Sequence, residues 1–194
     1  SCSVHVQGRD SIMTINLKPD FLITKPEKLD LDCAIVLNGE DFNPPHVGLL
    51  LGNKYYSCTV NGLKLGFSFT QFFQILSRKK QKVIIFNTSL NLDKKLVESV
   101  FVEYQNLGVD YSCYKPLKMC FELVKNKPIN AEFVYELIEL LTVENNITAT
   151  YHLGFDLISN NKPVEIPRYN KQDVVNCINN AKIELERKIK TAVY

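Results

Sequence analysis

The spacing of apolar residues changes several times along this chain, and the first half contains the patterns of several short strands. Residues 33–37 form a continuous apolar run of strand length, which predicts a buried central strand. Two further apolar runs, at 46–51 and from residue 55, flank a Gly52-Asn53 pair and predict a β-hairpin. Residues 63–66 continue it as a third strand, and residues 83–86 predict another buried strand.

Other segments carry apolar residues at helical spacing. Ser68 and Asp93 stand where N-caps are expected, each before a stripe of apolar side chains. Further helices are predicted over 117–125, from Asn130, and from residue 170 or 171 to about 191. Residues 148–158 alternate and predict a β-segment. Because strands and helices are mixed without strict alternation, the predicted class is α+β.

The length of 194 residues suits one domain with extensions at both ends. Residues 1–30 contain Pro19 and Pro26, which exclude a long helix and predict an arm or a small hairpin. Residues 31–145 are predicted to form the core, and residues 146–194 a β-segment followed by a C-terminal helix.

Composition narrows the function classes. A net charge of +2 gives no reason to expect a nucleic-acid partner, and no apolar stretch reaches the length of a membrane span. The six cysteines include no closely spaced pair, so no structural zinc and no cofactor is expected. Several of them lie in apolar runs and no signal-peptide pattern opens the chain, so we expect reduced thiols, no disulfide and a cytoplasmic location.

His46 and Cys120 are the residues with the clearest chemical potential. His46 opens the first strand of the predicted hairpin, and Cys120 lies three residues into the helix predicted from residue 117. A helix N-terminus and nearby cations such as Lys115 and Lys118 lower a thiol pKa, and an imidazole can take the thiol proton. The alternative is that His46 is a strand-edge histidine and Cys120 an inert, buried thiol.

Other cysteine arrangements are weaker. Cys113, in a predicted loop near Cys120, is either its redox neighbour or a thiol without a role. His152 could serve Cys33 or Cys58, but neither cysteine follows a residue suited to an oxyanion site, and both are expected to pack in strands.

Four short motifs occur in an order that resembles one known superfamily. They are His46-Val47-Gly48-Leu49, Gly62-Leu63, Gly108-Val109-Asp110-Tyr111 and Cys120-Phe121-Glu122-Leu123-Val124. In this order, over residues 32–141, the chain resembles the circularly permuted papain-like superfamily, which includes NlpC-type hydrolases, lecithin–retinol acyltransferase-like proteins and a poxvirus branch. Cys33 and Ala34 replace the Gly-Asp pair that this superfamily has on the strand before the histidine.

The resemblance implies a fold and a reaction. The fold would be a permuted papain-like core, an antiparallel sheet with packed helices. Cys120 would attack an amide or ester, His46 would act as the base, and Ser57 would take the position that orients the histidine ring. Many relatives have a carboxylate or amide at this third position, and serine orients a ring less firmly. Two hypotheses follow: a thiol hydrolase or acyl transferase, and a degraded fold, viral or host-interacting, that binds a protein partner.

Overall fold

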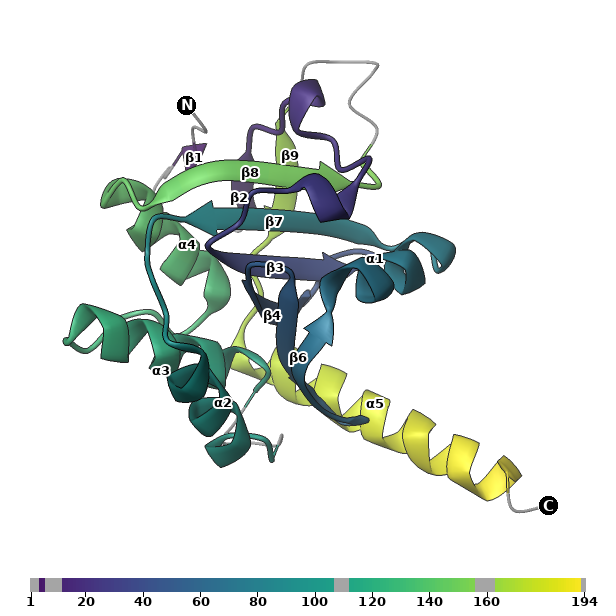
Figure 1. Ribbon diagram of the computed structural model, residues 1–194. Helices are drawn as coiled ribbons and strands as arrows, with labels where there is room; N and C mark the ends of the chain where they lie inside the picture. The colour runs from purple at the N-terminus through teal and green to yellow at the C-terminus, as the bar shows by residue number, and fades with distance from the viewer. Residues whose placement is uncertain (1–3, 6–11, 107–111, 156–162, 193–194) are drawn as a thin grey trace.

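The computed structural model describes residues 4–5, 12–106, 112–155 and 163–192, and its fold is α+β. A six-stranded antiparallel sheet forms the centre of the molecule (Figure 1). In sheet order its strands are β6 (Gly62–Ser68), β5 (Lys54–Thr59), β4 (His46–Leu51), β3 (Cys33–Gly39), β7 (Lys82–Thr88) and β8 (Ile147–Leu153). The predicted strands at 33–37, 46–51, 55 onward, 63–66 and 83–86 are therefore confirmed.

Helices cover both faces of this sheet because its central strands are apolar on both sides. Along β3, Ala34 and Val36 face α1 (Phe69–Arg78), whereas Cys33, Ile35 and Leu37 face the opposite core. That second core is closed by α2 (Lys94–Glu103), α3 (Tyr114–Lys125) and α4 (Val134–Val143). The two-sided burial is the reason that the strand reads as a continuous apolar run.

Both predicted N-caps are confirmed. The Ser68 hydroxyl accepts a hydrogen bond from the Gln71 N–H at 3.4 Å, and α1 begins at the next residue. The Asp93 carboxylate accepts one from the Leu96 N–H at 3.0 Å at the start of α2. Each cap supplies an acceptor to an N–H that has no partner inside its helix.

The predicted boundaries at the two ends of the chain differ from the structure. β2 (Ile12–Ile15) pairs with β1 (Val4–His5) on one side and with β9 (Val164–Pro167) on the other, in a separate three-stranded sheet. β2 thus lies between β1 of the same arm and the distant β9, and Met13 and Ile15 belong to the core. β8 pairs with β7, so the central sheet extends beyond the boundary predicted at residue 145.

Two short 3-10 helices follow β2, namely η1 (Pro19–Phe21) and η2 (Pro26–Lys28). Each has proline in its first turn, where the missing N–H costs no hydrogen bond.

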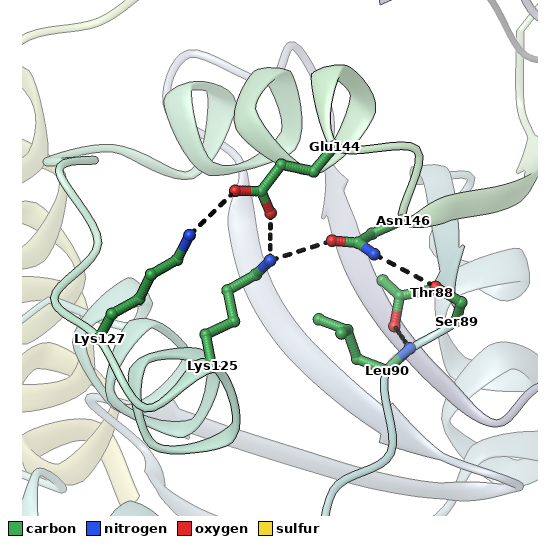
Figure 2. Close-up of polar contacts among 7 residues, drawn as sticks. All are labelled: Thr88, Ser89, Leu90, Lys125, Lys127, Glu144 and Asn146. Atoms are coloured by element: carbon green, nitrogen blue, oxygen red, sulfur yellow. Dashed lines mark hydrogen bonds and ion pairs between the residues drawn. The ribbon is translucent and has the colours of Figure 1, made fainter.

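A polar network ties together the ends of α3, α4, β7 and β8 (Figure 2). The Lys125 ammonium, at the end of α3, forms an ion pair with the Glu144 carboxylate that follows α4. It also donates to the Asn146 side-chain oxygen at 3.0 Å, and the Asn146 amide donates to the Ser89 hydroxyl at 3.4 Å. Lys127 adds a second, longer contact to Glu144 at 3.4 Å. The network fixes this end of the helical layer to the sheet.

The predicted C-terminal helix is confirmed as α5 (Lys171–Ala192), which extends away from the body of the protein (yellow in Figure 1). Ile178, in its first half, is its one buried residue. In the second half Ile183 and Ile189 are 48% and 56% exposed. Contacts between α5 and the other helices and strands of the described chain are sparse. The helix is therefore attached at its beginning and free along its end.

Candidate functional site

A cavity of about 630 Å³ opens where the ends of β3, β4 and β5 meet the start of α3 and the first half of α5. Its volume lies within the range of pockets that hold small ligands. The sheet contributes His46 and Val47 to its lining, α3 contributes the region of Cys113, and α5 contributes residues of its first three turns. The cavity joins three parts of the chain that are far apart in sequence.

His46 lies at the cavity, as the prediction of a reactive histidine requires. It is the first residue of β4 and is paired with Asn38 of β3. The imidazole Nε2 is buried and has no hydrogen-bond partner. Burial lowers the pKa of His46 to about 4, and the nearby positive charge of Lys64 acts in the same direction. His46 is therefore neutral at physiological pH.

Cys120 does not line the cavity. The helix begins at Tyr114 and not at the predicted residue 117, so Cys120 is its seventh residue. Two helical turns, about 10 Å of rise, separate Cys120 from the cap, and the effect of the helix terminus fades within one turn. Cys120 is fully buried among apolar side chains, and this burial raises its pKa to about 12. A thiol in this position has no access to a substrate, which is the inert alternative considered above.

Cys113, and not Cys120, lies at the start of α3. It is the N-cap residue of α3, is partly exposed, and lines the same cavity as His46. Burial raises the pKa of Cys113 to about 11. The backbone N–H of Val47, on β4, acts in the opposite direction and lowers this pKa. The Cys177 sulfur raises the pKa further, while the N–H groups of Cys113 and Tyr114 lower it. Backbone N–H groups of a strand and of a helix start thus favour the thiolate, but their effect is smaller than that of burial.

The missed position had a signal in the sequence. Pro116 stands in the third position of α3, and proline is tolerated in the first turn of a helix because those N–H groups have no helical partner. Reading Pro116 as a first-turn residue, and not as part of a loop, would have placed the N-cap between Cys113 and Lys115.

Ser57 does not hold the histidine ring in this structure. It is fully buried on β5, and its hydroxyl has no hydrogen-bond partner. The space beside Gly48 is filled by the ring of Tyr55 from the neighbouring strand. This part of the sheet is therefore packed core, and substrate could reach His46 from the cavity side alone.

Other candidate residues have structural roles. Cys33 and Cys58 are fully buried in strands, burial raises the pKa of each to about 12, and the Cys58 thiol donates to the Phe101 carbonyl at 3.7 Å. His152 is hydrogen-bonded through Nε2 to the Lys18 carbonyl oxygen at 2.7 Å. All five cysteines in the described part of the chain are free; Cys2 and the predicted motif at 108–111 lie outside the described residues.

The start of α5 is anchored beside the cavity by aromatic side chains. The Tyr135 hydroxyl of α4 donates to the Tyr169 carbonyl at 3.0 Å, two residues before α5 begins. The Tyr169 ring lies edge-on to Phe133 and Tyr135, with centroids 5.5 and 5.2 Å away. Tyr169 and Phe133 both line the cavity. This cluster determines where the first turn of α5 crosses the cavity.

Within the described ranges, no group of three or more His, Cys, Asp or Glu side chains is placed to hold a metal ion. None of the helices described is both long and apolar enough to cross a bilayer. Comparison with known proteins finds no family model, no curated protein and no solved structure that matches the chain.

Proposed function

We propose that the protein is a thiol hydrolase or acyl transferase in which Cys113, and not Cys120, is the nucleophile and His46 the base. The proposal is carried by one observation: Cys113 is the N-cap residue of α3 and lines the same cavity as His46. A permuted papain-like arrangement, with a histidine strand beside a cysteine helix, is consistent with this placement.

In the proposed reaction the Cys113 sulfur attacks the carbonyl carbon of an amide or ester. His46 takes the thiol proton and later gives it to the leaving amine or alcohol. The carbonyl oxygen becomes an oxyanion, which backbone N–H groups at the start of α3 could stabilise. If water then attacks the thioester, the reaction is a hydrolysis. If a second acceptor attacks it, the reaction is an acyl transfer.

A second function, a binding module without chemistry, is favoured by the protonation state of the site. The pKa of Cys113 is raised to about 11 and that of His46 is lowered to about 4, so the proton stays on sulfur at neutral pH. The Nε2 atom has no partner and Ser57 does not orient the ring. In this case a protein or peptide segment would occupy the cavity without reacting.

Acylation by p-nitrophenyl acetate separates the two functions. If Cys113 is the nucleophile, mass mapping of the quenched protein will find the acetyl group on this residue. Cys113→Ala should abolish the modification, and His46→Ala should slow it by about 10²- to 10⁴-fold, the range for loss of a general base. Cys120→Ala is the matched control, because it should leave the rate unchanged.

The pH dependence of the same reaction tests the role of His46. If the imidazole assists the thiol, replacing His46 with alanine will remove one inflection from the rate profile of Cys113 acetylation. Equal acetylation of all accessible thiols, with a profile that is indifferent to His46, would instead support the binding module.

A further inference from the structure

Three thiols line the cavity, and they differ in availability. Cys58 is fully buried, and its sulfur donates to the Phe101 carbonyl. Cys113, at the start of α3, is partly exposed, and Cys177, on α5, is exposed. The last two are therefore the pair that a small oxidant in the cavity would meet first.

Helix geometry places Cys177 on the side of α5 that faces the cavity. Val174 lies three residues before it and Ala181 four residues after it, so all three share one stripe of the helix. Both neighbours line the cavity, as does Cys177 itself. Electrostatic repulsion from Cys177 raises the pKa of the Cys113 thiol, the direction expected for two thiols that line one cavity. The two sulfurs thus face one cavity from different helices.

The sparse attachment of α5 would allow this helix to move relative to α3. Ile178 is its one buried residue, and Tyr169 anchors the chain just before it. Its contacts with the remaining elements of the described chain are sparse. A disulfide needs Cα atoms about 4.4–6.8 Å apart. A rotation of α5 about its anchored end would change the separation of the two Cα atoms.

We propose that Cys113 and Cys177 are a redox-sensitive pair that forms a disulfide between α3 and α5 when the protein meets a peroxide. Hydrogen peroxide oxidises the exposed Cys177 thiol to a sulfenic acid and is itself reduced to water. The Cys113 sulfur then attacks the Cys177 sulfur, the S–S bond forms, and the hydroxyl leaves as a second water. A thiol reductant reverses the bond.

The disulfide would have two consequences for the molecule. It would fix the first half of α5 over the cavity, and it would remove the free thiol at the start of α3. The proposal rests on the cavity and on α5, and it holds whether or not Cys113 carries out acyl chemistry.

The experiment treats the reduced full chain with hydrogen peroxide, blocks remaining thiols by alkylation and maps peptides without reduction. The expected result is one major cross-linked species, Cys113 joined to Cys177 within one chain, that dithiothreitol removes. Cys113→Ser and Cys177→Ser should each abolish it, whereas Cys58→Val should retain it. Hydrogen exchange over 171–181 should slow in the cross-linked form and return to its original rate after reduction.

Other outcomes would overturn the proposal. These are oxidation of Cys177 to a sulfinic or sulfonic acid without a cross-link, a bond between Cys58 and Cys113, or a bond between two chains. Acetylation of Cys113 in the reduced protein is measured separately. Loss of the acyl chemistry with an intact cross-link would therefore reject the proposed function alone.

Discussion

At the scale of single residues, Gly48 shows how closely the two strands beside the candidate site are packed. A Cβ added at Gly48 would lie 2.3 Å from both Cε2 and the hydroxyl oxygen of Tyr55. The Tyr55 ring is fully buried and stacks on Phe72 with a centroid separation of 4.1 Å, so it has no free direction to move. The glycine is required by packing and not by the chemistry of the cavity.

We therefore predict that Gly48→Ala lowers the free energy of unfolding by about 1–3 kcal/mol or more, the usual cost of overfilling a core. Gly39→Ala is the matched control on the neighbouring strand, because its added Cβ would be 3.5 Å from the Phe42 ring, an ordinary contact. Urea denaturation of both variants measures the difference. Equal stability of the two variants would contradict the packing described here.

A second prediction concerns the titration of His46. Its pKa in the folded protein is about 4, below the ordinary value of 6.5, because of burial and the charge of Lys64. Between these values the unfolded chain binds the proton more readily, so the contribution of His46 to stability falls as the pH decreases. NMR titration should find the low pKa, and Lys64→Met should raise it. Lys94→Met, on the exposed surface of α2, should not. A His46 pKa near 6.5 would reject this description.

Local signals at single residues explain which site residues could be identified from the sequence. His46 was predicted because an apolar run and a Gly-Asn turn define its strand unambiguously. Cys120 was preferred to Cys113 because its motif resembled the superfamily pattern and because Pro116 was interpreted as the end of a loop, which moved the expected helix start by three residues. An error of one helical turn is enough to exchange a cavity thiol for a core thiol. Which side of a helix contacts a distant strand is decided by tertiary packing, which local patterns do not encode.

At the scale of elements, the ends of α3 and α4 depend on an ion pair that is partly shielded from water. The Lys125 side chain is 11% exposed and the Glu144 side chain 26%. The hydrogen bond from Lys125 lowers the pKa of Glu144, and partial burial opposes this effect. Removing either side chain leaves the opposite charge shielded from water and unpaired. The free energy of unfolding therefore falls by more than it does when an exposed ion pair is lost.

Glu144→Gln should accordingly destabilise the protein near neutral pH more than Glu98→Gln, whose partner Lys94 is exposed and 3.8 Å away. The folded pKa of Glu144 lies below its value of 4.5 in the unfolded chain, so its stabilising effect is present above this pH and is lost below it. The stability difference between wild type and Glu144→Gln should therefore shrink on acidification to about pH 3. Chemical denaturation at both pH values checks this. A difference that is constant with pH would indicate that the charge of Glu144 is not involved.

Elements were predicted best where a local signal acts alone. Ser68 and Asp93 begin their helices as expected, since a cap is a contact between near neighbours in sequence. The start of α4 was missed: the helix begins at Val134, four residues after Asn130, and the Glu136 carboxylate accepts from the Phe133 N–H. β8 was recognised as a β-segment and residues 1–30 as an arm or small hairpin, but the partners of β8 and β2 are set by long-range pairing. Which strands pair with one another was therefore less predictable than the presence of each strand or helix.

At the scale of the whole molecule, the cavity exists because α5 returns to the start of α3 after the chain has completed both sheets (Figure 1). The resemblance to papain-like proteins ended near residue 141, so it included no part of α5, which forms one wall of the cavity. The helical spacing of its apolar residues predicted α5, and those residues form one stripe along the helix. The structure uses that stripe in the first half, around Ile178, and leaves Ile189 exposed in the second.

Two truncations separate the roles of these halves. A chain that ends at Ala181 keeps the cavity wall and Ile178, so its melting temperature and the alkylation rate of Cys113 by iodoacetamide should match those of the full chain. A chain that ends at Asn170 loses the wall, and Cys113 should be alkylated faster. It also loses the buried Ile178 side chain, whose complete burial is worth about 1.5–3 kcal/mol, so its melting temperature should fall. Full-length Cys177→Ser is the control that removes the competing thiol but retains the wall.

If the chain ending at Asn170 keeps both the rate and the melting temperature of the full chain, α5 neither covers the thiol nor stabilises the fold. If sedimentation instead finds that the full chain associates and that the chain ending at Ala181 does not, the exposed half of α5 packs between molecules.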